Sequence, residues 1–320
     1  MLDPSVIARA AEIRHQFQQA KPFRHVAIDN FLASGNCEGL LRDFPAFDPK
    51  RAMNELGMVG RKACVERVVD ISPFYADFYR YINSKSFLDA MSAVTGIEDL
   101  MADSTLFGGG THENLSGQGL DVHIDFNIDE RTMLHRRVNL LIYLNKEWEE
   151  AWGGAIELHS NPHNPLVDEL ATFVPLFNRA VIFETSEYSW HGFRRIALPP
   201  EKQHLSRKSF SIYLYTKDRP VDEVVAPHTT FYVPQPLPGN LRVGHTLTDD
   251  DMLQLHVITQ GRDGLLKMYQ KLLVEKEQRL ADFLSLYHEG SPDYRGITAS
   301  RSWKLVMALR RLEHRLRNLF

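Results

Sequence analysis

A series of short apolar segments fills the middle of the chain and limits most strongly what it can fold into. Between Leu106 and Pro220 these segments alternate with glycine, asparagine and proline, at residues 105–115, 119–127, 136–145, 155–160, 171–185 and 208–217. Short apolar runs of this length, bounded by turn residues, are typical of β-strands. The spacing predicts an all-β barrel or sandwich for this part of the chain.

The N-terminal part is predicted to be mainly helical. Residues 3–20 carry apolar side chains at helical spacing, with Asp3 or Ser5 available as the N-cap. Further elements are predicted as a strand at 24–32, a helix at 34–44 capped by Ser34, and helices at 73–83 and 86–96.

The C-terminal part differs from both. Residues 220–240 are proline-rich and extended, which indicates a linker or a wrapping segment, and 263–289 have a long helical pattern. Residues 300–320 predict a basic amphipathic helix, which either contacts an anionic membrane surface or packs on the barrel. We therefore expect three parts, 1–105, 106–220 and 221–320.

Composition excludes several classes of protein. A net charge of -4 and a pI near 6.4 argue against a surface built to bind nucleic acid. The two cysteines, Cys37 and Cys64, form no CxxC pair, which fits a reduced cytoplasm, with the inner face of the membrane as an alternative location. No apolar run approaches the roughly 20 residues that a membrane-spanning helix needs.

His123 and Asp125 stand two positions apart in one predicted strand. Alternate residues of a strand point to the same face, and a rise of about 3.3 Å per residue separates their Cα atoms by only about 6.6 Å. His191, which follows the predicted strand at 179–185, could supply a third ligand. Two imidazoles and one carboxylate form the facial triad of non-haem Fe(II) oxygenases, which leaves coordination positions open.

A keto acid bound to such an iron would need a fixed cation for its distal carboxylate. Arg207 lies on the strand after His191, with Ser209 two residues further and therefore on the same face. Arginine suits bidentate carboxylate binding, and Tyr143 could add a phenolic hydrogen bond. Lys208 and Arg195 remain alternatives to Arg207, because residues 196–205 lengthen the interval after His191.

From Leu106 to Asp218 the chain resembles the Fe(II)- and 2-oxoglutarate-dependent dioxygenases of the prolyl-hydroxylase type, including the catalytic domain of hypoxia-inducible-factor prolyl hydroxylases. The resemblance is carried, after the HID of residues 123–125, by IYLNKEW (142–148), GGAIEL (153–158), PLFNRAVIF (175–183) and SRKSFSIYLY (206–215). It implies an α+β fold with a double-stranded β-helix, or jelly roll, as its mainly β core, flanked by the N-terminal helices and a helical C-terminal extension.

The resemblance also implies the cofactors and their residues. His123, Asp125 and His191 would hold Fe(II), Arg207 would bind the distal carboxylate of 2-oxoglutarate, and Tyr143 would assist it. O2 would be the second co-substrate, with ascorbate as a candidate reductant. Halogenating relatives replace the carboxylate ligand by a small residue, so Asp125 favours hydroxylation or desaturation.

Several polar residues outside the predicted metal and co-substrate sites are also considered for a role. His135, Arg136 and Arg137 stand just before a predicted core strand. Either one of them reaches an anionic substrate, or all three form an exposed strand start. His159 and His228 lack a partner at ligand spacing and are expected at the surface.

The prime substrate is less constrained than the reaction. Residues 300–312 are similar to a segment of bacterial glycosyltransferases and associated proteins of surface-polysaccharide synthesis, which indicates a small molecule or glycan precursor as the substrate. A prolyl peptide or an amino acid is the alternative substrate. A cupin-type isomerase and a non-catalytic jelly-roll binding protein are the alternative functions, and neither needs the Arg207 clamp.

Overall fold

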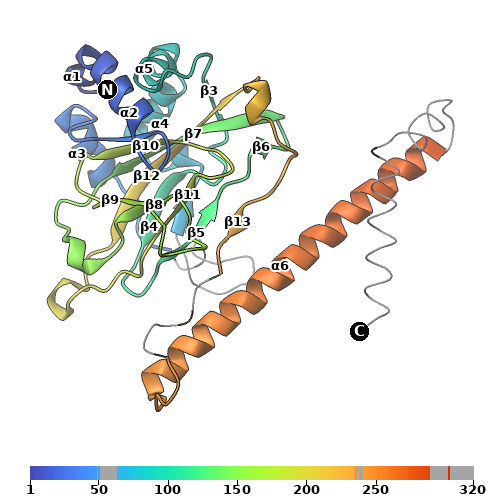
Figure 1. Cartoon of the computed structure of the whole chain (residues 1–320). Coiled ribbons are helices and arrows are strands. Elements are labelled where there is room, and N and C mark those ends of the chain that lie inside the picture. The colour runs from blue at the N-terminus through green and yellow to red at the C-terminus, as the bar shows by residue number, and fades with distance from the viewer. Residues whose placement is uncertain (49, 51–62, 235–236, 238–240, 289–301, 303–320) are drawn as a thin grey trace. The chain divides into compact units, whose positions relative to one another are not determined.

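The computed structural model describes residues 1–48, 50, 63–234, 237, 241–288 and 302 of the chain (Figure 1). It separates into two compact units, Met1–Pro236 and Leu237–Phe320. The first unit contains both the predicted N-terminal helices and the predicted β core, while the three-part division of the chain stays a prediction.

Two antiparallel sheets form the centre of the first unit. The larger sheet has eight strands in the order β1-β10-β7-β12-β4-β2, with β3 paired to β12 and β6 to β7. Its strands are β1 (His25–Ile28), β2 (Ala63–Val65), β3 (Met101–Ala102), β4 (Gly110–Asn114), β6 (Ile128–Asp129), β7 (Leu134–Tyr143), β10 (Ala180–Glu184) and β12 (Arg207–Thr216).

The smaller sheet has five strands in the order β13-β5-β11-β8-β9. They are β5 (Leu120–Ile124), β8 (Ile156–His159), β9 (Leu170–Phe173), β11 (Trp190–Phe193) and β13 (Phe231–Tyr232). Two sheets whose strands alternate along the chain are the arrangement of the double-stranded β-helix, so the predicted mainly β core is confirmed.

The helices cover one face of the larger sheet (Figure 1). They are α1 (Pro4–Ala8), α2 (Ala10–Gln19), α3 (Ser34–Arg42), α4 (Pro73–Ile82) and α5 (Lys85–Thr95). Phe78 of α4 and Phe210 of β12 meet edge to face, with ring centroids 5.1 Å apart, an arrangement that contributes about 0.5–1.5 kcal/mol beyond area burial.

Two details at the helix ends differ from the sequence prediction. Asp3 caps α1 as predicted, but the helical segment is interrupted at Arg9 and forms two helices. Ser34 is the first residue of α3 and Ala33 takes the cap position, with no capping side chain.

Both faces of the larger sheet are buried, as β10 illustrates. Ala180 and Ile182 pack with the helices, whereas Val181 and Phe183 belong to an inner cluster with Tyr143 of β7. Since alternate residues point to opposite faces, the inner cluster lies between the two sheets. This inner face carries the candidate site.

The linker region contributes to the fold. Residues Phe231–Tyr232, within the predicted linker or wrapping segment, form β13 and pair with β5. Short 3-10 turns complete the unit as η2 (Val68–Asp70), η3 (Glu150–Trp152), η4 (Pro200–Lys202) and η5 (Val221–Glu223).

The second unit contains one long helix, α6 (Asp249–His288), which has 40 residues and starts well before the predicted residue 263. The predicted helix at 300–320 lies outside the described residues, apart from Ser302. Within the described part of the chain, no helix combines the length and the apolar character that crossing a membrane requires.

Candidate metal and co-substrate site

His123, Asp125 and His191 converge on the inner face of the smaller sheet. His123 on β5 lies directly opposite His191 on β11, with ring centroids 4.3 Å apart, and Asp125 directly follows β5. One nitrogen of each ring and one Asp125 oxygen all lie within 4.8 Å of one another. Among the described residues, this is the one set of three histidine, cysteine or carboxylate side chains found in such an arrangement.

Backbone carbonyls fix which nitrogen of each ring faces Asp125. The Nδ1 of His123 lies 2.8 Å from the carbonyl oxygen of Asp121, and the Nδ1 of His191 lies 2.9 Å from that of Ser189. A carbonyl only accepts hydrogen bonds, so each neutral ring carries its proton on Nδ1. The unprotonated Nε2 atoms face Asp125, at 3.7 Å for His123 and 3.5 Å for His191. This tautomer is the one that a metal ligand needs.

The surroundings keep Asp125 ionised and His191 neutral. Burial alone would raise the pKa of Asp125, but the Arg136 guanidinium, the two imidazoles and the Asn139 amide outweigh it and lower the pKa. Burial lowers the pKa of His191. Two neutral imidazoles and one carboxylate are the donor set of the facial triad, so the residues fit a bound Fe(II).

Arg136 and Asn139 hold Asp125 in place. The Nη2 of Arg136 lies 3.1 Å from Asp125 Oδ2, and Asn139 Nδ2 donates to the same oxygen at 2.8 Å. Arg136 also donates to Asn139 Oδ1, and its guanidinium lies 3.7 Å from the ring centroid of Tyr213. The two groups that hold the carboxylate are therefore themselves held by further contacts.

The expected exposed strand start is wrong for Arg136 and Arg137, whereas contact of one of His135, Arg136 and Arg137 with an anionic substrate stays a prediction. Arg136 and Arg137 are 2% and 5% exposed, and Arg137 pairs with Glu184 at 2.9 Å. The register between β7 and β12 shifts after the Leu214–Val138 pair, so that Tyr215 lies opposite Arg136. This irregularity turns the Arg136 side chain to the inner face. Simple alternation along the strand did not predict this position.

Arg207 of β12, on the inner face of the larger sheet, has a second buried polar environment. Its Nε donates to the carbonyl oxygen of Gly154 at 2.7 Å, and its Nη2 donates to the Tyr143 hydroxyl at 3.1 Å. The guanidinium also lies 4.1 Å from the ring centroid of Phe193. Burial lowers the pKa of Arg207.

No carboxylate of the described residues lies within ion-pair distance of Arg207. An unpaired buried charge is costly, and a carboxylate from a ligand removes that cost. Burial raises the pKa of Tyr143, which keeps its phenol protonated and able to donate. The environment of Arg207 and Tyr143 therefore fits the distal carboxylate of a dicarboxylate.

The competing cations point elsewhere. Lys208 pairs with Glu113 at 2.8 Å, and Arg195 is exposed. Ser209 is buried on the same face as Arg207 and lies opposite Tyr143 in the sheet register. Two histidines expected at the surface are instead partly buried and paired, His159 with Asp168 and His228 with Glu187.

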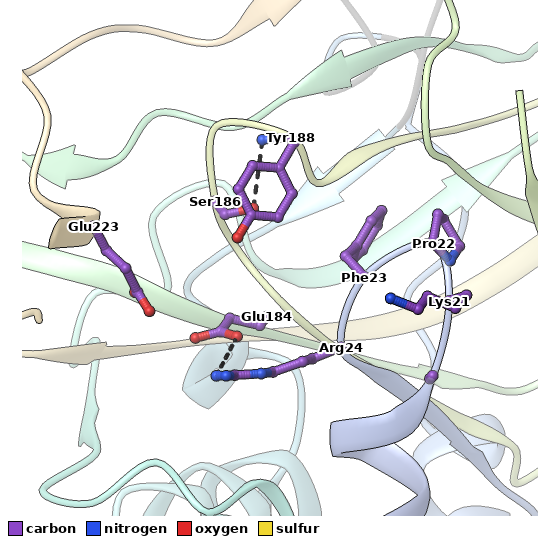
Figure 2. A pocket seen from close by; sticks show the side chains of 9 residues that line it. Lys21, Pro22, Phe23, Arg24, Glu184, Ser186, Tyr188 and Glu223 are labelled. Atoms are coloured by element: carbon purple, nitrogen blue, oxygen red, sulfur yellow. Dashed lines mark hydrogen bonds and ion pairs between the residues drawn. The ribbon is translucent and has the colours of Figure 1, made fainter. Parts of the chain in front are cut away.

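A cavity of about 200 Å³ lies beside the loop between β10 and β11 (Figure 2). Arg24 and Glu184 form an ion pair at 3.1 Å in its wall. Phe23, also in the wall, packs against Phe183, which in turn lies 4.7 Å from His191 between ring centroids. The cavity wall is thus linked to the metal centre through packed aromatic rings.

Comparison with known proteins agrees with this geometry. The family model described as the 2OG-Fe(II) oxygenase superfamily matches residues 110–215, a segment that includes the triad, Tyr143 and Arg207. This segment is a 2OG-Fe(II) oxygenase domain. The chain therefore carries an Fe(II)- and 2-oxoglutarate-dependent oxygenase domain, which confirms the predicted reaction class and these two cofactors.

The chain is similar to several solved structures at low sequence identity. A prolyl hydroxylase from Trichoplax adhaerens, in complex with a hypoxia-inducible-factor peptide, is 18% identical, with 67% of this chain and 91% of that chain covered and a TM-score of 0.47. A prolyl 4-hydroxylase from Phytophthora capsici is 17% identical over 81% and 75% of the chains, with a TM-score of 0.46. HygX from Streptomyces hygroscopicus, with nickel and 2-oxoglutarate bound, is 13% identical over 64% and 91%, with a TM-score of 0.41.

Proposed function

We propose that this dioxygenase hydroxylates a C–H bond of a small molecule or glycan precursor, with Fe(II) held by His123, Asp125 and His191. Bound Fe(II) supplies the activation of O2, in a reaction that consumes 2-oxoglutarate and releases succinate and CO2. The tautomers fixed by the carbonyls of Asp121 and Ser189 support the ligand roles of the two histidines. The retained carboxylate of Asp125 supports hydroxylation as the outcome.

One observation carries the co-substrate assignment, which is the buried Arg207 guanidinium without a carboxylate partner among the described residues. In the proposal, Arg207 binds the distal carboxylate of 2-oxoglutarate, and Tyr143 donates a hydrogen bond to it. Ser209, on the same inner face, lines this pocket. The pairing of Lys208 with Glu113 favours Arg207 over its neighbour.

The substrate proposal has a different basis. Residues 300–312 are similar to a segment of proteins of surface-polysaccharide synthesis, which supports a glycan precursor and contact of residues 300–320 with the inner face of a membrane. A substrate screen should begin with glycan precursors, with ascorbate as reductant. A prolyl peptide and free amino acids are the competing outcomes of this screen.

An anaerobic titration with Fe(II) and 2-oxoglutarate tests the site without knowledge of the prime substrate. We expect a visible charge-transfer band in the unchanged chain and no band in His191→Ala. Arg207→Ala should need roughly 10- to 150-fold more 2-oxoglutarate, because a charge-assisted hydrogen bond contributes about 1.5–3 kcal/mol.

The exposed Arg195 provides the control. Arg195→Ala should titrate like the unchanged chain, since its side chain lies outside the pocket. An unchanged 2-oxoglutarate requirement in Arg207→Ala would remove the clamp assignment. Absence of the band in a folded, iron-loaded chain would remove the triad assignment as well.

A further inference from the structure

The segment that follows the oxygenase core returns to the metal centre. Residues 226–233, here called the strap, run along the free edge of β5. Asn127 donates to the carbonyl oxygen of Ala226 at 3.0 Å and accepts from the backbone N–H of His228 at 2.9 Å. Val233 donates to the carbonyl oxygen of Val122 at 2.8 Å. The strap thus becomes the outer strand of the sheet that carries His123.

The side chain of His228 also connects the strap to the loop that precedes β11, the strand of His191. The Nε2 of His228 lies 2.9 Å from a Glu187 oxygen, and its ring stacks on Phe231 with centroids 4.8 Å apart. Glu187 belongs to the loop that leads into β11 and His191. The strap therefore contacts β5, the strand of His123, and the loop that leads into β11, the strand of His191.

Tyr232 brings an aromatic ring against His123. The two residues lie directly opposite each other in the β13–β5 pair, and their ring centroids are 5.1 Å apart. Directly opposite residues of an antiparallel pair share a face. Tyr232 therefore lies on the inner face, and its neighbour Phe231 points to the other face, where it stacks on His228.

The sheet order defines which side of the triad Tyr232 occupies. Arg207 contacts Gly154, just before β8, and Phe193, at the end of β11. In the order β13-β5-β11-β8-β9, these contacts lie on the β11–β8 side of His123 and Tyr232 lies on the opposite side. The proposed co-substrate pocket and the strap thus flank the triad.

We propose that the strap is part of the active site, and that Tyr232 is a positioning residue that holds the His123 ring and forms the wall of the site on the side away from Arg207. The inference rests on the proposed function, because it takes His123 as an iron ligand. The strap lies beyond residues 110–215, so this wall comes from outside the oxygenase family segment.

The test compares variants of the full chain in the anaerobic Fe(II) titration at saturating 2-oxoglutarate. Tyr232→Ala should need on the order of tenfold more Fe(II) for half of the charge-transfer band, the scale on which residues behind metal ligands act. Tyr232→Phe keeps the ring and should titrate like the unchanged chain. Val221→Ala, at an exposed residue outside the strap, is the control and should also leave the titration unchanged.

A second measurement separates positioning from general damage. At saturating Fe(II), the 2-oxoglutarate requirement of Tyr232→Ala should equal that of the unchanged chain, because Arg207 lies on the other side of the triad. Tyr232→Leu keeps an apolar side chain and should reproduce the weaker Fe(II) binding if Tyr232→Ala does not fold.

The failures are distinguishable. If the unchanged chain gives no band, the proposed function fails. If it gives the band and Tyr232→Ala and Tyr232→Leu bind Fe(II) as tightly as the unchanged chain, only the role of the strap is overturned. Equal weakening in Tyr232→Phe or in Val221→Ala also overturns it, because the effect would then not depend on the ring beside His123.

Discussion

Two buried arginines on the inner face of the larger sheet have opposite environments. Arg136 lies 3.1 Å from a carboxylate oxygen of Asp125, whereas the hydrogen bonds of Arg207 go to a carbonyl and a phenol. Burial lowers the pKa of both groups, but the charge of Asp125 reverses the direction for Arg136 and raises its pKa. The charge of Arg136 is thus balanced by a carboxylate of the chain, whereas the charge of Arg207 can still be balanced by the carboxylate of a ligand.

The difference between the two arginines predicts that the largest loss of stability follows substitution of Arg136. In the metal-free chain, Arg136→Met should lower the free energy of unfolding by about 3–5 kcal/mol, because it leaves the buried carboxylate of Asp125 without its counter-charge. Urea denaturation of the unchanged and variant chains measures the difference. A loss below about 1 kcal/mol would mean that the imidazoles and Asn139 suffice to stabilise the carboxylate.

Arg207→Met should behave in the opposite way. Without 2-oxoglutarate, its free energy of unfolding should equal or exceed that of the unchanged chain, since replacing buried charge by an apolar side chain is often neutral or stabilising by about 1–4 kcal/mol. With 2-oxoglutarate, the unchanged chain should gain about 2.7 kcal/mol at 100 times the Kd, and the variant should gain little at that concentration. Urea denaturation of the iron-loaded, anaerobic protein with and without 2-oxoglutarate measures both. A large loss of stability in the ligand-free variant would contradict the contrast between the two arginines.

Asn139→Ala should lower the stability less than Arg136→Met. It removes one hydrogen bond to Asp125 and two that Arg136 donates, but leaves the ion pair, so we expect a loss of about 1–3 kcal/mol in the metal-free chain. The same denaturation experiment applies. A loss as large as that of Arg136→Met would show that the amide, rather than the charge, maintains the position of Asp125.

The sequence predicts the parts of the site that depend on regular alternation. His123 and Asp125, and likewise Arg207 and Ser209, are two residues apart and share a face. The fold class follows from strand spacing in the same way. These inferences need only the period of a β-strand.

The other features of the site depend on contacts between residues that are far apart in the sequence, and local patterns do not predict such contacts. Arg136 reaches Asp125 where the register shifts, so the period of two fails there. Tyr232 meets His123 through pairing between segments about a hundred residues apart, and a proline-rich stretch gives only a weak strand signal. His228 looked like a surface residue because its partner, Glu187, lies in a distant loop.

The short strand β13 has a mechanical consequence. Tyr232 is followed within a few residues by Leu237, where the second compact unit begins. The segment that leads to α6 is therefore hydrogen-bonded, through β13, to the sheet that carries His123. Tension on that tether would load the β13–β5 hydrogen bonds before it reached any other strand, so the strand that borders the metal centre is also the mechanical anchor of the C-terminal unit.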